Sequence, residues 1–151
     1  MNTFVRRNKL NIFLLICCLP IFLIAVNLQI INVDGILESN FLSVNSIFAG
    51  FLFTSLGIIA GILDKEIIVF LDERGYLDGY INGIVIGLIM HITSAITELM
   101  VNNIDMNITL DTEVLINQIV FMFLVAGIVF FIKSLFNILK LIKIIRNQNK
   151  K

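Results

Sequence analysis

The chain has very few of the residues from which enzymes usually build their sites. Among its 151 residues there are one histidine, one proline and no tryptophan, and charged residues make up only 15%. The two cysteines, Cys17 and Cys18, are adjacent, a spacing that fits disulfide geometry badly. The sequence therefore offers no disulfide framework, and we expect both thiols to be small buried apolar side chains.

Chemical motifs are missing as well. The sequence contains no glycine-rich phosphate loop, no paired clusters of metal ligands, and no Ser/His/Asp or Cys/His set with partners on one side of a membrane. We therefore expect no catalytic residues, no cofactor, no metal site and no enzyme activity. The basic C-terminal tail is too short and too apolar to suggest nucleic-acid binding.

Apolar residues, in contrast, are abundant: they make up 58% of the chain, against roughly 45–50% in soluble domains, and the mean hydropathy is +0.99. Crossing a bilayer takes about 20 helical residues. Four apolar runs are long enough, at about residues 10–33, 44–63, 80–101 and 114–132. Because hydrocarbon offers no partners for backbone polar groups, such runs predict helices. The predicted fold is all-α, an integral membrane bundle of four antiparallel transmembrane helices forming one domain over residues 1–151.

The basic residues all lie on one side of this predicted topology. All 11 Lys and Arg residues fall before the first span, in the 64–79 connection, or after Ile132. The opposite connections, residues 34–43 and 102–113, contain acidic residues and no Lys or Arg. The positive-inside rule therefore predicts that both termini are cytoplasmic. The expected location is the cell membrane, as a multi-pass protein.

Three segments allow two interpretations each. The first span follows basic residues, as a signal peptide does, but its length and the lack of a small-x-small cleavage site favour a retained anchor. Residues 67–71 are apolar but too few to span, so they lie at the interface or pack under the bundle. The chain after Lys133 is expected to continue as a basic helix to about residue 146, into the cytoplasm or along the anionic inner leaflet.

Small residues repeat on the third predicted helix. Gly79, Gly83 and Gly87 are spaced by four residues and therefore share one face. Small residues at this spacing let another helix approach closely. This face either packs within the bundle or mediates self-association.

The same helix contains the ionisable residues of the predicted membrane interior. His91, Ser94 and Glu98 recur at i, i+3 and i+7, on one face. Ionisable groups in a bilayer are costly and often indicate a polar path or a proton relay. The structural alternative is a neutral His91 that is hydrogen-bonded to Thr54 or Ser55, which we expect at similar depth on the second helix.

Polar residues also gather in the outer third of every predicted span. If they face inward, they form a polar, acidic vestibule; if they face lipid headgroups, they are ordinary interfacial residues. The set comprises Asn27, Gln29, Asn32, Asn45, Ser46, Thr97, Glu98, Asn117 and Gln118.

Two glycine-containing segments resemble a known group of proteins. They are residues 57–61 (GIIAG) and 74–79 (RGYLDG), the latter leading into Gly83 and Gly87. Their order is similar to that in small four-helix membrane proteins of Gram-positive bacteria that have no assigned function. The resemblance implies the same topology and a bacterial plasma membrane, and it leaves the activity open.

These features predict a small non-enzymatic membrane protein that acts by helix–helix contact, as an accessory, stabilising or immunity-type subunit of a larger membrane partner. The glycine face, the small extramembrane mass and the absence of recognisable chemistry favour this interpretation. The alternative is a self-associating small transporter or pore, which conducts through the outer vestibule past Glu98 and His91. The expected partners are thus the lipid bilayer and either a membrane protein or further copies of the chain, and no nucleic acid.

Overall fold

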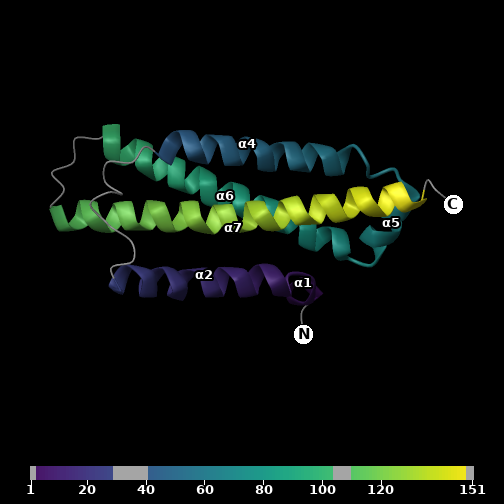
Figure 1. The fold of residues 1–151 in the computed structure, drawn as a ribbon, viewed down its shortest axis with the longest axis horizontal. Coiled ribbons are helices and arrows are strands. Elements are labelled where there is room, and N and C mark those ends of the chain that lie inside the picture. Colours follow the sequence, from purple (N-terminus) through teal and green to yellow (C-terminus); the bar gives the residue numbers. More distant parts are fainter. Residues whose placement is uncertain (1–2, 29–40, 104–109, 149–151) are drawn as a thin grey trace.

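The computed structural model describes residues 3–28, 41–103 and 110–148, and every element in these ranges is a helix (Figure 1). In chain order they are α1 (Thr3–Arg7), α2 (Lys9–Asn27), α4 (Phe41–Ala60), α5 (Glu66–Glu73), α6 (Tyr76–Asn103) and α7 (Leu110–Gln148). Four of them, α2, α4, α6 and α7, are long and apolar enough to cross a membrane. The all-helical class and the four long apolar helices agree with the sequence-based prediction.

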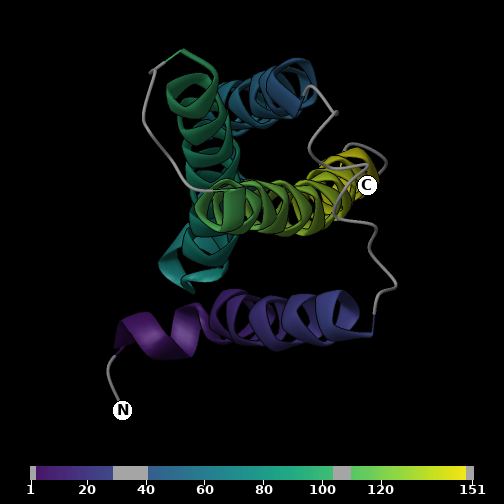
Figure 2. The same ribbon diagram turned by 90° about the vertical axis from the view of Figure 1, so that its left-hand side faces the viewer.

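The four long helices run in alternating directions (Figure 1). Helices α1 and α5 and the C-terminal part of α7 lie toward the same end of the molecule, which we call the α5 end. Helices α4, α6 and α7 pack closely together, whereas α2 lies against α6 and α7 on the side away from α4 (Figure 2). The arrangement therefore differs from a bundle in which each helix lies beside the next, because α2 and α4 are on opposite sides of α7.

The apolar core at the α5 end includes a contribution from the short helix α5. Ile68 of α5 is fully buried in a cluster with Leu77 of α6 and Leu141 of α7. On the other side of α5, Val69 and Phe70 are exposed. Gly75 makes the turn from α5 into α6 with a backbone φ of 74°, a value that residues other than glycine rarely adopt. Of the two interpretations of residues 67–71, packing under the bundle is supported by the burial of Ile68.

Helix α7 is unbroken over 39 residues, which corresponds to about 58 Å. The basic stretch after Lys133 continues the fourth apolar run in one helix, without a break. The expected end of the first span, at residue 33, lies outside the described residues. The ends of α4 and α6 differ from the expected ones by a few residues: α4 ends at Ala60 and α6 begins at Tyr76. These small shifts matter for the site described below.

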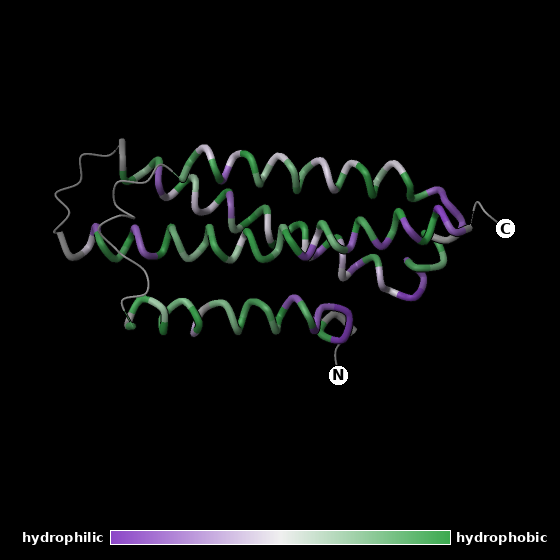
Figure 3. Tube along the Cα trace, in the orientation of Figure 1, coloured by the Kyte–Doolittle hydropathy of each residue, from purple (hydrophilic) through white to green (hydrophobic). Residues whose placement is uncertain are grey.

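Large apolar side chains cover the outside of the long helices, as the hydropathy colouring in Figure 3 indicates. Phe13 on α2, Phe53 on α4 and Phe136 on α7 are 61%, 71% and 59% exposed. Hydrophilic residues concentrate instead at the α5 end (Figure 3). The exterior is therefore apolar along the helices and polar at the α5 end.

Candidate functional site

Buried polar side chains gather in two places within the described part of the chain. The first, which we call the His91 cluster, consists of Asn45 on α4 with His91 and Ser94 on α6; each is at most 1% exposed. The second, the Asn8 cluster, consists of Asn8 before α2, Asn11 in α2 and the half-buried Asn82 of α6. A buried polar group without a hydrogen bond destabilises the fold, so the partners of each group decide what it can do.

The His91 cluster is a chain of hydrogen bonds across three helices. His91 Nδ1 lies 2.9 Å from Asn45 Oδ1, and Asn45 Nδ2 donates to Ser94 Oγ at 2.8 Å. Ser94 Oγ in turn donates to the backbone carbonyl of Val120 on α7 at 3.0 Å. Because the amide oxygen can only accept, this assignment puts a proton on Nδ1. The cluster thus joins α4, α6 and α7.

The imidazole ring is closely packed. Phe48 of α4 stacks on it, with ring centroids 5.4 Å apart and an interplanar angle of 11°. At the other edge lies Gly127 of α7, where an added methyl group would come within 2.6 Å of His91 Nε2. Nε2 itself has no hydrogen-bond partner. Glycine at position 127 is therefore required for α7 to approach the ring.

The expected partners Thr54 and Ser55 form their hydrogen bonds elsewhere than at His91. Their hydroxyls donate to carbonyls of their own helix, those of Gly50 and Phe51, at 2.9 and 2.8 Å. The expectation of a hydrogen bond between His91 and either of them is therefore wrong, because Asn45 is the side chain that bonds to His91. The reason lies in the observed helix ends: Asn45 lies fifteen residues before Ala60, and His91 lies fifteen residues after Tyr76, so the two reach the same depth.

Glu98 lies on the same face of α6 as His91 and Ser94, but it has a different partner. Its Oε1 accepts a hydrogen bond of 2.9 Å from the backbone N–H of Phe41, the first residue of α4. Carboxylates are favourable at helix N-termini, whose first N–H groups lack partners within the helix. Glu98 is 8% exposed, and its Oε2 has no partner. His91 and Ser94 therefore belong to one hydrogen-bonded cluster, whereas Glu98 caps the first turn of α4.

The polar residues expected in the outer third have different environments. Asn45 and Glu98 are buried between helices, and Ser46 is exposed. Thr97, Asn117 and Gln118 are half-buried. Gln29 and Asn32 lie outside the described residues, and so does the side chain of Asn27.

The glycine face of α6 is filled by the chain itself. An added Cβ would lie 2.9 Å from the Arg7 carbonyl oxygen at Gly79, 3.0 Å from Lys133 Nζ at Gly83, and 2.9 Å from Leu52 Cδ1 at Gly87. These neighbours come from α1, α7 and α4, so the face serves packing within the molecule. Two glycines of α4, Gly50 and Gly57, which sequence reasoning did not assign to a helix contact, have no atom within 4 Å of such a Cβ.

The Asn8 cluster fastens α2 to α6. Asn8 Oδ1 accepts from Asn11 Nδ2 at 2.9 Å and from Asn82 Nδ2 at 3.1 Å. Asn11 Nδ2 also donates to the Gly79 carbonyl at 3.1 Å, and Arg7 forms an ion pair with Asp78. Sequence reasoning missed these asparagines; the available signal was the pair Asn8 and Asn11, at i and i+3, where an apolar run begins.

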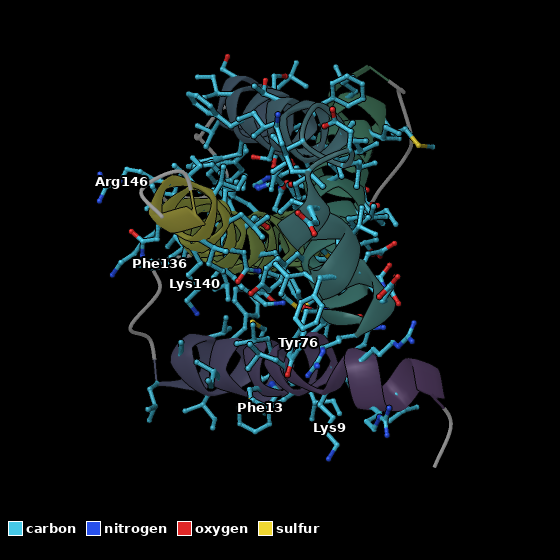
Figure 4. All side chains as sticks on the ribbon, turned by 90° about the vertical axis from the view of Figure 1, so that its right-hand side faces the viewer. Lys9, Phe13, Tyr76, Phe136, Lys140 and Arg146 are labelled. Atoms are coloured by element: carbon cyan, nitrogen blue, oxygen red, sulfur yellow. The ribbon has the colours of Figure 1, made fainter. Side chains whose placement is uncertain are left out.

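A pocket of about 420 Å³ opens beside the Asn8 cluster, between the start of α2, the turn from α5 to α6, and α7. Tyr76 lies on the side of α6 that faces α2 (Figure 4). The lining residues are Arg6, Arg7, Leu10, Asn11, Arg74, Gly75, Tyr76, Gly79, Tyr80, Lys133 and Asn137. Four of them are basic and none is acidic.

Among the described residues, no three His, Cys, Asp or Glu side chains lie together to hold a metal ion. Cys17 and Cys18 are free and half-buried on α2. No protein-family model, curated protein or solved structure matches this chain. The function must therefore be argued from the geometry.

Proposed function

We propose that this chain is a multi-pass protein of a bacterial plasma membrane, with both termini in the cytoplasm, that acts as an accessory, stabilising or immunity-type subunit of a larger membrane protein. Its four long helices carry exposed apolar side chains, which a bilayer would cover. The basic residues around the α5 end support a cytoplasmic location of that end.

One observation carries the proposed mode of action: small residues on α4 face outward, and no other described helix packs against its two glycines there. Gly50 and Gly57 have open space beside them, and Ser46 and Thr54 are exposed on the same helix. The core of α4, with Leu52 and Ile59, lies on the other side of the helix. In a bilayer, association between helices relies on close packing, which small residues permit. We therefore assign the outward face of α4 as the contact surface for a partner helix.

The alternative, a pore that conducts past His91, has less support. The side chains of Asn45, His91 and Ser94 are bonded to one another and closely packed. Thr54 and Ser55, which were candidates for the same path, bond to their own helix. The described polar groups thus serve helix packing at this depth.

The test is extraction of the chain from its native host in mild detergent, followed by native mass spectrometry. The proposal expects a stoichiometric complex with a larger membrane protein. The double variant Gly50→Leu with Gly57→Leu should lower recovery of that partner by about tenfold, since bulky side chains prevent close approach. Its control is Ile47→Leu with Ile58→Leu, which alters exposed residues of the same helix and should leave recovery unchanged.

Two results would contradict this proposal. A lone monomer would remove the accessory role, and full partner recovery with the double glycine variant would remove α4 as the contact surface. A defined homo-oligomer without other chains would instead favour the pore or transporter, to be tested by flux in liposomes with variants of His91 and Glu98.

A further inference from the structure

Four basic side chains line the pocket at the α5 end, and only one of them forms an ion pair with a described carboxylate. Arg7 is paired with Asp78, the one ion pair among the described residues. Arg6, Arg74 and Lys133 line the same pocket, and in residues 3–28, 41–103 and 110–148 no carboxylate is in salt-bridge contact with them. Arg74 lies over the ring of Phe70, 4.4 Å from its centroid, and this contact leaves its charge unneutralised. Three basic side chains therefore meet at one cavity, and no carboxylate of the described residues forms a salt bridge with them.

Two buried amides beside these charges have unused hydrogen-bonding capacity. Asn137 of α7 is 7% exposed, and its Nδ2 has no partner. Asn11 of α2 is 1% exposed; its Nδ2 is satisfied, but its Oδ1 has no partner. Both residues line the pocket. Unsatisfied groups of this kind are rare in native folds, and here one donor and one acceptor without a partner belong to two residues that line the same cavity.

This combination defines the chemistry of a ligand. Basic side chains and the Asn137 N–H group suit a phosphate, which is an anion with several acceptor oxygens. The Asn11 oxygen requires a donor, which a bare phosphate diester lacks and a neighbouring hydroxyl supplies. The volume of about 420 Å³ lies within the range of about 300–1,000 Å³ for small-molecule sites. Tyr76 and Tyr80 also line the pocket, and tyrosine is common at the level of lipid headgroups.

We propose that this pocket binds a glycerol phosphate group, presented either by the headgroup of phosphatidylglycerol or by soluble glycerol 3-phosphate. The phosphate interacts with Arg6, Arg74 and Lys133 and accepts a hydrogen bond from Asn137 Nδ2. A glycerol hydroxyl donates to Asn11 Oδ1. The site is distinct from the outward face of α4, so it does not depend on the partner contact proposed above. Only the lipid source requires the proposed membrane location.

The two sources are separated by two binding measurements on the full chain. In the first, the chain is placed in nanodiscs of phosphatidylglycerol mixed with phosphatidylcholine, and the lipids it retains are counted by native mass spectrometry. In the second, glycerol 3-phosphate is titrated into the chain in neutral detergent by calorimetry. Retention of one phosphatidylglycerol in preference to phosphatidylcholine identifies the lipid, and saturable binding of glycerol 3-phosphate alone identifies the soluble ligand. Absence of both overturns the proposal.

Variants then tie the binding to the pocket. Lys133→Gln and Arg6→Gln should each weaken binding by about tenfold through loss of a charged contact. Asn137→Leu keeps every charge and removes the free donor, so a similar loss with this variant separates a built site from general attraction to cations. The matched control is Lys9→Gln, because Lys9 is exposed, does not line the pocket and points away from it (Figure 4).

Two outcomes of the variant series would overturn the proposal. One is a loss with Lys9→Gln equal to that with Lys133→Gln, which would mean nonspecific electrostatic binding. The other is unchanged binding in Asn137→Leu. Unfolding of each variant by sodium dodecyl sulfate, followed by circular dichroism, identifies any variant whose loss of binding reflects a loss of fold.

Discussion

The His91 cluster and the Asn8 cluster contain similar side chains, but the first is closely packed on all described sides and the second lies beside a pocket. In the His91 cluster, Asn45 engages both ends of its amide with protein partners, and Phe48 and Gly127 close around the imidazole. In the Asn8 cluster, Asn11 engages only its nitrogen, and a basic pocket opens beside it. The comparison teaches that a buried amide serves packing when its partners are all protein atoms, whereas an amide with an unpartnered atom beside a basic pocket is a candidate ligand contact.

The position of α2 explains the difference. Helices α4, α6 and α7 meet closely around His91, whereas α2 lies outside this group and is fastened to α6 by the asparagines and the Arg7–Asp78 ion pair. At its other end, Phe22 contacts Phe121 of α7, with ring centroids 6.1 Å apart. The pocket lies beside the first of these attachments, at the start of α2, where the peripheral helix leaves space that the three-helix core does not.

The largest effect is expected when the enclosed cluster is overfilled. Gly127→Ala places a methyl group against the His91 ring and should lower the free energy of unfolding by about 1–3 kcal/mol. Gly50→Ala, with open space beside it, should change stability little or raise it by up to about 1 kcal/mol, since alanine favours helix. Both are measured by unfolding in sodium dodecyl sulfate, and equal effects would mean that the ring is not tightly enclosed.

Removing the central amide should have a somewhat smaller effect. Asn45→Leu leaves the Nδ1–H of His91 without an acceptor and should cost about 1–2 kcal/mol in the same unfolding assay. Thr54→Val serves as the control, because that hydroxyl bonds only to its own helix, and it should have little effect. If Thr54→Val proved the more damaging change, the assignment of Asn45 as the partner of His91 would fail.

The smallest effect is expected at the open cluster. Arg7→Gln removes the ion pair with Asp78, whose side chains are 38% and 40% exposed, so the loss should stay below about 1 kcal/mol. The charge-swapped double variant Arg7→Asp with Asp78→Arg should recover part of it. A loss larger than that of Asn45→Leu would show that α2 is held as firmly as the core helices.

Sequence reasoning could predict the helices because each apolar run is a local property of the chain. It could also place His91 and Ser94 on one face, since the spacing i, i+3 fixes that within a helix. The partner of His91 was missed because it depends on the relative depth of two helices. Helix α4 ends and helix α6 begins a few residues earlier than expected. Because the two helices are antiparallel, these shifts add, and together they displace the pairing by about 10 Å, or roughly two turns.

The Asn8 cluster could not be predicted for a different reason. Asn8 and Asn11 lie more than 70 residues from Asn82 in the chain, and no local pattern brings the first helix beside the third. The neighbours of α2 are set by packing among all four long helices. The unpaired atoms of Asn11 and Asn137, on which the proposed ligand site depends, likewise become visible only in three dimensions.

The unbroken helix α7 has a mechanical consequence. Val120, which receives the hydrogen bond of Ser94, and Lys133, which lines the pocket, are carried by one rod and lie about 20 Å apart along it. A sideways shift of the whole of α7 that widened the pocket would also move the Val120 carbonyl and stretch its hydrogen bond from Ser94, so that widening would cost stability in the enclosed cluster.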